Sequence, residues 1–168
     1  MAFNDTIKGA LPEYAKDTKL NLDAVLLRSS LDADVAMGCA VAALAATGNG
    51  KVLSILLADA PVHAESAMTA ANIMAQNNVW YPYVEMAGDE LLKGLPAQLR
   101  MNAIATHGGT TEENFEAFSL AASIVGKCHF CVKAHYDTLK KKGYSLDQLR
   151  DIGRIASVMN SVAKVLNS

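Results

Sequence analysis

Helical periodicity runs through almost the whole sequence, and it is the feature that most restricts the fold. Apolar residues recur at helical spacing, glycines and prolines separate the periodic segments, and alternating strand patterns are nearly absent. Asp32 can cap a helix that ends near Thr47, because Gly48, Asn49 and Gly50 together supply a stop signal. The sequence therefore predicts an all-α fold, a bundle of packed helices.

The middle of the chain predicts two further helices followed by a turn. Residues 51–58 and 62–76 have helical spacing and are separated at Pro61. The aromatic segment that follows, NNVWYPYVEM, contains Pro82. Proline inside a helix removes a hydrogen bond and clashes with the preceding turn. We therefore expect this segment to form a turn between helices.

Capping signals predict the last three helices. Thr110 and Glu113 have the spacing of a capping box, and Gly126 can end the helix that they begin in a left-handed conformation. The next helix starts at the cysteines of KCHFCVKAHY and ends in three lysines. Their positive charges stabilise the negative, C-terminal end of the helix dipole. Ser145 and Gln148 repeat the capping-box spacing before the final helix.

Composition and charge exclude several classes of protein. At 168 residues the chain is expected to form one domain, residues 1–168, that buries roughly 70% of its unfolded surface. Basic residues are scattered and not interleaved with aromatic ones, so nucleic-acid binding is not expected. The longest uncharged apolar run, 35–46, is shorter than the ~20 residues of a membrane span. The start, MAFNDTIKGALPEY, lacks a signal-peptide core, which predicts a cytoplasmic location.

The chain contains three cysteines, and two of them form a CxxC pair. An odd number of thiols in a cytoplasmic protein argues against a framework of structural disulfides. Cys39 lies in the apolar stretch VAMGCAVAALAA and is expected to be a small buried residue. The pair at Cys128 and Cys131 is expected to be redox-active or metal-binding.

A helix that begins near Cys128 places Cys128, Cys131 and His135 along one face, because residues three and four apart are neighbours there. An i, i+3 pair has its Cα atoms roughly 5 Å apart, which is inside the range in which a disulfide can close. The two cysteines can therefore cycle between dithiol and disulfide with little movement of the backbone.

A base near the cysteines is needed for them to react at neutral pH. The pKa of a free thiol is ~8.5, and lowering this pKa far enough for the thiol to be half ionised at neutral pH requires about 2 kcal/mol. A helix N-terminus contributes only ~0.3 to 1 kcal/mol. His135 can supply the remainder, and Glu116 on the preceding helix can orient and recharge its imidazole if that helix folds back.

The same residues leave other interpretations open. A zinc site could combine Cys128, Cys131 and His135 with Glu116 or His129, although structural zinc sites usually contain a second ligand pair. The cysteines could also be two buried residues without a shared function. Covalent haem attachment is excluded because valine, not histidine, follows the second cysteine.

The chain resembles the alkylhydroperoxidase D-like family, within the carboxymuconolactone decarboxylase superfamily. The family motif is a glutamate, eleven residues, CxxC, three residues and a histidine. Here it reads E-AFSLAASIVGK-CHFC-VKA-H, with Glu116, Cys128, Cys131 and His135 in register. The segments GALPEYAKDTKLNL, ANIMAQNNVWY and LRMNAIA are also similar, so the resemblance covers nearly the whole chain.

The resemblance implies an all-helical fold with an internally duplicated helical unit, assembled as a homotrimer. It implies an antioxidant peroxidase and disulfide reductase that holds no bound cofactor and no metal. Cys131 would attack an organic hydroperoxide and become a sulfenic acid, and Cys128 would resolve it to a disulfide. Glu116 and His135 would relay protons through water to generate the thiolates. A dihydrolipoyl group on an acyltransferase would be the electron donor, and the peroxiredoxin AhpC would be an acceptor.

The sequence departs from the family at one position. A second relay histidine commonly precedes the second cysteine, but Phe130 occupies that place and a histidine stands at position 129. Neighbouring helical positions point about 100° apart, so His129 is not an automatic substitute. Carboxymuconolactone decarboxylases share the wider fold without a cysteine pair, which argues against that reaction. Two alternatives remain: a disulfide-exchange adaptor with little peroxidase activity, and a non-redox metal-binding helical module.

Overall fold

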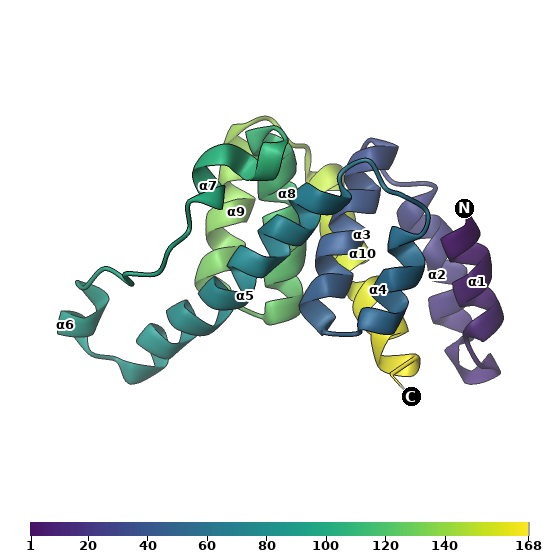
Figure 1. Ribbon diagram of the computed structural model, residues 1–168, viewed down its shortest axis with the longest axis horizontal. Coiled ribbons are helices and arrows are strands. Elements are labelled where there is room, and N and C mark those ends of the chain that lie inside the picture. The colour runs from purple at the N-terminus through teal and green to yellow at the C-terminus, as the bar shows by residue number, and fades with distance from the viewer. Residues whose placement is uncertain (168) are drawn as a thin grey trace.

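The structure, a computed structural model, describes residues 1–167, and its regular elements are all helical (Figure 1). This confirms the predicted all-α fold, while the internal duplication remains a prediction. No helix in the described part of the chain is long and apolar enough to cross a membrane. The elements are α1 (Ala2–Ala10), η1 (Glu13–Ala15), α2 (Lys16–Leu26), α3 (Ala33–Thr47), α4 (Gly50–Leu57), α5 (Ala64–Ala87), α6 (Glu90–Lys93), α7 (Ala103–Thr106), η2 (His107–Gly109), α8 (Glu112–Gly126), α9 (His129–Lys141) and α10 (Leu146–Val165).

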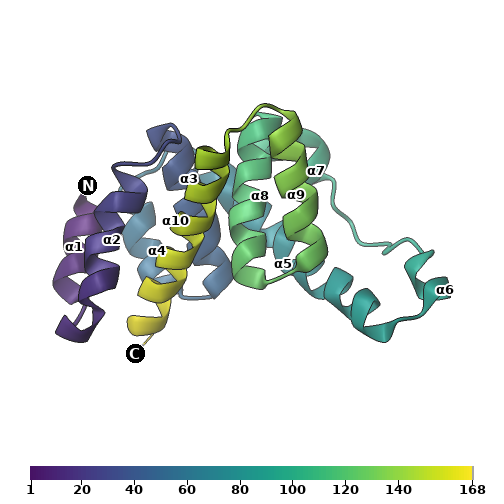
Figure 2. The ribbon, with the colours of Figure 1, turned by 180° about the vertical axis from the view of Figure 1, so that it is seen from behind.

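Helix α3 forms the centre of the bundle. It packs against α5, α8 and α10, and α8 packs in turn against α5 and α9 (Figures 1 and 2). Its middle, from Gly38 to Leu44, is a run of small and apolar residues that are fully buried. Small side chains let the neighbouring helices approach closely. Gly38 is the clearest case, since a Cβ atom there would lie 2.3 Å from the ring of Phe118.

Cys39 is buried in this core, as predicted, and has no cysteine partner. Its Sγ lies 3.7 Å from the carbonyl oxygen of Ala117 on α8. Burial raises the pKa of the Cys39 thiol well above its usual value, because the thiolate would be poorly solvated there. Cys39 is therefore an inert packing residue.

The predicted turn at the aromatic segment is wrong. Helix α5 continues through Pro82 to Ala87, where Gly88 ends it in the left-handed conformation. The proline ring lacks the N–H that would bond the carbonyl of Asn78, yet packing of the preceding turns against α3 and α8 holds the helix in place. The last turns of α5, together with α6 and the following loop, form an arm, residues 79–101, that extends away from the bundle (Figures 1 and 2).

Two predicted helix boundaries in α8 are shifted by one residue. Thr111, not Thr110, is the N-cap, and its hydroxyl accepts the N–H of Asn114. Lys127, not Gly126, adopts the left-handed conformation after the helix. Two other predictions are confirmed: α3 ends at Gly48, and Ser145 and Gln148 form a capping box at the start of α10. Helix α5 begins at Ala64 instead of residue 62.

Replacing Gly38 with alanine tests the close packing of α3 against α8. The new methyl group would overlap Phe118, so the free energy of unfolding should fall by about 1–3 kcal/mol despite the better helix propensity of alanine. Gly153→Ala in α10 is the matched control, because its Cβ would have open space. That variant should gain up to about 1 kcal/mol. Urea unfolding measures both, and equal stability of the two variants would refute the packing argument.

Candidate active site

The predicted site residues come together where α5, α8 and α9 pack against one another (Figure 2). Cys128 is the N-cap of α9 and Cys131 lies in its first turn. Their sulfurs form a disulfide, with the Cα atoms 5.3 Å apart. This matches the separation expected of an i, i+3 pair. Both residues are almost inaccessible, with 1% of Cys128 and 3% of Cys131 exposed.

A tight turn between α8 and α9 places Cys128 at the positive end of α9. Lys127 takes the left-handed conformation at φ 55°, and the Cys128 N–H bonds the Ser123 carbonyl 3.4 Å away. The Cys128 Sγ then accepts the N–H of Cys131 at 3.2 Å. A helix N-terminus and an N–H donor both stabilise negative charge on sulfur. The Cys128 sulfur therefore lies at the positive end of α9 and next to an N–H donor.

Helix α5 covers the other side of the disulfide. The Asn77 carbonyl oxygen lies 3.6 Å from Sγ of Cys131 and 4.0 Å from Sγ of Cys128. This approach depends on Gly126, since a Cβ there would lie 2.2 Å from the amide of Asn78. Asn78 instead donates to the Ala122 carbonyl on α8 at 3.4 Å. Gly126 therefore serves close packing of α5 on α8 and not, as expected, a left-handed helix end.

The structure brings Glu116 and His135 into direct contact. Oε2 of Glu116 lies 2.7 Å from Nδ1 of His135, and both side chains are mostly buried. The second ring nitrogen, Nε2, lies 3.1 Å from the sulfur of Met74 on α5. The sequence indicated the glutamate and the histidine. It gave Met74 no role beyond filling the core, because its helical spacing is that of an ordinary apolar residue.

His129 and Phe130 both point away from this arrangement. His129 is 85% exposed, and its Nδ1 lies 3.9 Å from Glu85 on α5. Phe130 is 55% exposed and stacks on Tyr81, with ring centroids 4.4 Å apart. Neither residue contacts Glu116 in the described structure, and so neither replaces the second relay histidine of the family.

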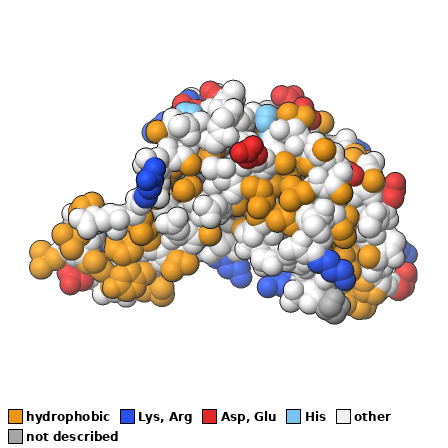
Figure 3. Space-filling view, in the orientation of Figure 1, with side chains coloured by type: hydrophobic (Ala, Val, Ile, Leu, Met, Phe, Trp, Pro, Cys, Tyr) orange, Lys and Arg blue, Asp and Glu red, His pale blue; other side chains and the backbone are white. Residues whose placement is uncertain are grey.

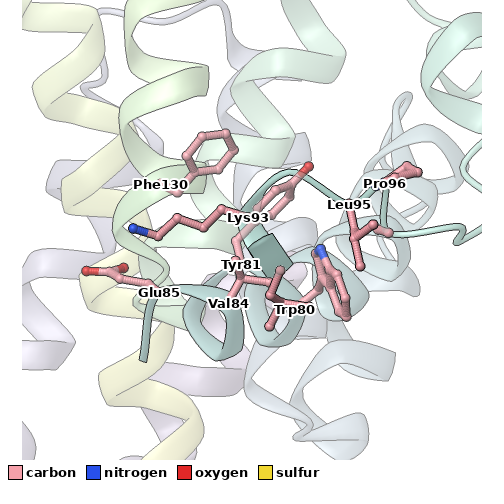
Figure 4. A pocket seen from close by; sticks show the side chains of 10 residues that line it. Trp80, Tyr81, Val84, Glu85, Lys93, Leu95, Pro96 and Phe130 are labelled. Atoms are coloured by element: carbon pink, nitrogen blue, oxygen red, sulfur yellow. The ribbon is translucent and has the colours of Figure 1, made fainter. Parts of the chain in front are cut away.

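Two concave surfaces lie near the disulfide. The larger, about 550 Å³, is an aromatic groove on the arm whose lining includes Phe130, Tyr81, Trp80 and Leu95 (Figure 4). It reaches the disulfide only through Phe130, the chain neighbour of Cys131. A more open, mostly apolar concavity of about 480 Å³ runs along α9 and includes Cys128 in its lining.

Within the described residues, no three histidine, cysteine, aspartate or glutamate side chains are grouped as a metal ion would require. In the zinc interpretation, Glu116 or His129 would be the fourth ligand. The structure instead pairs Glu116 with His135 and directs His129 toward solvent. The two sulfurs are bonded to each other.

Comparisons with known proteins agree with the motif. Residues 90–168 match the carboxymuconolactone decarboxylase family. The chain is 41% identical to the alkyl hydroperoxide reductase AhpD of Rhodospirillum centenum, over 98% of this chain and 90% of the relative. It is 42% identical to that of Anaeromyxobacter dehalogenans, over 99% and 91%, and 39% identical to that of Coxiella burnetii, over 95% and 94%.

Proposed function

The chain belongs to the family of the alkyl hydroperoxide reductases AhpD, and from this premise we propose that it reduces organic hydroperoxides with the Cys128–Cys131 dithiol. The observation that carries the proposal is a disulfide at the start of α9, with a histidine further along the same helix paired to a glutamate on α8. A disulfide of this geometry can open and close without rebuilding the backbone. The carboxymuconolactone decarboxylase reaction is less suited to the site, because it has no use for a cysteine pair.

In the oxidative half of the cycle, the thiolate of Cys131 attacks the terminal oxygen of the hydroperoxide. The O–O bond breaks, Cys131 becomes a sulfenic acid, and the alkoxide takes a proton to leave as an alcohol. The thiolate of Cys128 then attacks the Cys131 sulfur, the S–O bond breaks, and the hydroxide leaves as water after protonation. The two thiols lose two electrons, and the peroxide gains them.

Glu116 and His135 form the proton relay of this cycle. The hydrogen bond to Glu116 orients the imidazole. The pair takes protons from the thiols and returns them to the alkoxide and the hydroxide. It lies within the bundle and is screened from bulk water.

In the reductive half, a dihydrolipoyl group restores the dithiol. One donor thiolate attacks the protein disulfide, and the second donor thiol closes the lipoyl ring and releases the reduced pair. The donor would be carried by a lipoylated acyltransferase in the cytoplasm, and the reduced enzyme could also reduce the peroxiredoxin AhpC. These partners follow from the family, and no cofactor need remain bound.

Replacing Cys131 with serine tests the peroxidatic role. Turnover of cumene hydroperoxide should fall by at least about 10³-fold, because no sulfenic acid can form at that position. Cys128→Ser should still react once and gain one oxygen on Cys131, as mass spectrometry would show. Cys39→Ala is the control and should keep its turnover, since that thiol contacts neither member of the pair. Substantial peroxidase activity in Cys131→Ser would refute the assignment.

A second function, a disulfide-exchange adaptor, is supported by the position of Cys128 at a helix N-terminus. Turnover driven by dihydrolipoamide should be compared for cumene hydroperoxide and for oxidised AhpC. A peroxidase should reduce the hydroperoxide at a rate at least comparable with that of the protein. A rate with oxidised AhpC that is larger by two orders of magnitude or more would identify the adaptor instead.

The arm supports the proposal of a homotrimer. Its exposed apolar side chains gather at the end of the molecule in Figure 3. They are Val79, Tyr83, Met86, Leu91, Leu95 and Leu99. Apolar patches of this kind on a chain usually mark a contact with another protein. A second and third copy are the partners that the family predicts.

Light scattering after size exclusion tests the assembly. The wild-type protein should have three times the mass of one chain, and Met86→Glu with Leu91→Glu should reduce it to one, because two charges would have to be buried at the contact. Leu146→Glu, which changes an exposed leucine of α10, is the control and should leave the mass unchanged. A wild-type protein with the mass of a single chain would contradict the trimer.

A further inference from the structure

The imidazole ring of His135 has an acceptor against each of its two nitrogens. Nδ1 lies 2.7 Å from Oε2 of Glu116, and Nε2 lies 3.1 Å from the sulfur of Met74. A flipped ring would place carbon atoms at both contacts, so the contact with the carboxylate fixes the orientation of the ring. Met74 is buried, and the side chains of Glu116 and His135 are mostly buried. Both contacts therefore belong to the interior of the bundle.

The chemistry of these two partners restricts where the hydrogens of the ring can be. A thioether sulfur has no hydrogen to donate and can only accept one. A bare Nε2 would turn its lone pair toward the lone pairs of the Met74 sulfur, so this contact favours a hydrogen on Nε2. The contact between Nδ1 and Glu116 needs a hydrogen of its own, because two bare acceptors do not attract each other. The arrangement thus suits a pair that holds two hydrogens.

The contact at Met74 lies next to the disulfide. Asn77 follows Met74 by three residues on α5, and its carbonyl oxygen lies 3.6 Å from Sγ of Cys131. His135 follows Cys131 by four residues on α9, so the two side chains are neighbours on one face of that helix. The Met74 sulfur and the disulfide therefore lie against successive turns of the surface that α5 packs on α9.

A thioether is suited to hold a hydrogen that must later be given up. It accepts only weakly, whereas a thiolate is charged and is a much stronger acceptor. While the cysteines are joined, neither sulfur is a thiolate, and Met74 is the acceptor that the structure places against Nε2. When the disulfide opens, a cysteine that leaves as a thiolate would offer the same hydrogen a better partner.

We propose that Met74 is a positioning residue that holds a hydrogen on Nε2 of His135 while Cys128 and Cys131 form the disulfide. This role deepens the proposed thiol chemistry and rests on it. In the reductive half, a donor thiolate attacks one sulfur, the S–S bond breaks, and the ring gives its Nε2 hydrogen to the sulfur that leaves. The donor dithiol loses two electrons and two protons, and the cysteine pair gains them. The ring recovers its hydrogen from the donor's thiols through water.

Nitrogen NMR of the disulfide form at neutral pH tests this hydrogen directly. The chain contains four histidines, and the ring signals of His135 are those that disappear in His135→Gln. Long-range correlations from the carbon-bound ring hydrogens distinguish a bare nitrogen from one that carries a hydrogen. Nε2 should carry a hydrogen in the wild-type protein and be bare in Met74→Leu, because leucine fills a similar volume and accepts nothing. A bare Nε2 in the wild-type protein would overturn the proposal.

The consequence for the reaction is measured by stopped-flow reduction of the disulfide with dihydrolipoamide, without any peroxide. Met74→Leu should react about tenfold more slowly, a part of the ~100-fold or more that a proton-transfer group contributes. Met74→Gln offers an acceptor oxygen on a chain of similar length and should recover the Nε2 hydrogen and most of the rate. Met159→Leu, which changes a fully buried methionine of α10, is the matched control and should alter neither the ring signals nor the rate.

The order of the two Met74 variants separates a role in the relay from packing. Glutamine is the poorer fit to apolar surroundings, so a packing defect alone would make Met74→Gln slower than Met74→Leu. That order, or a wild-type rate in Met74→Leu, would overturn the proposal. A protein that exchanges disulfides normally but reduces no hydroperoxide would refute the peroxidase function only, and the ring signals and the reduction rates would still decide the role of Met74.

Discussion

The close approach of α5 to the last turn of α8 is the contact on which the site depends. Gly126 permits it, because the space that a side chain would occupy is filled by the amide of Asn78. The approach carries the Asn77 main chain onto the disulfide and places Met74 against the imidazole. A larger residue at position 126 would separate the helices and open the sulfurs to water. The reactive centre is thus enclosed by backbone packing as much as by side chains.

Part of the site could be predicted because it depends on one helix alone. The face shared by Cys128, Cys131 and His135 follows from helical geometry. The partnership with Glu116 required only that two consecutive helices fold back on each other. Met74 and Asn77 could not be found in this way, since they come from a helix more than fifty residues earlier whose packing no local pattern specifies.

Local signals failed where tertiary packing outweighed them. Pro82 was expected to end a helix, but its missing hydrogen bond falls where α5 leaves the bundle, and the well-packed turns before it keep their geometry. The sequence suggests that Gly126 ends α8 in the left-handed conformation, whereas in the structure its lack of a side chain is what lets α5 pack closely. Lys127 takes the left-handed position instead.

Burial of the sulfurs also restricts the kind of donor that suits the site. A neutral disulfide is buried at little cost, but a thiolate in the same place needs donors and a nearby cation. The Cys131 N–H and the positive end of α9 provide such stabilisation at Cys128, and His135 follows one turn beyond Cys131. Cys128 and Cys131 are only 1% and 3% exposed, so a donor thiol must reach below the surface to attack the disulfide. A dithiol at the end of a flexible hydrocarbon chain could enter along the apolar concavity that reaches Cys128. This concavity is therefore the route by which the proposed dihydrolipoyl group would reach the disulfide.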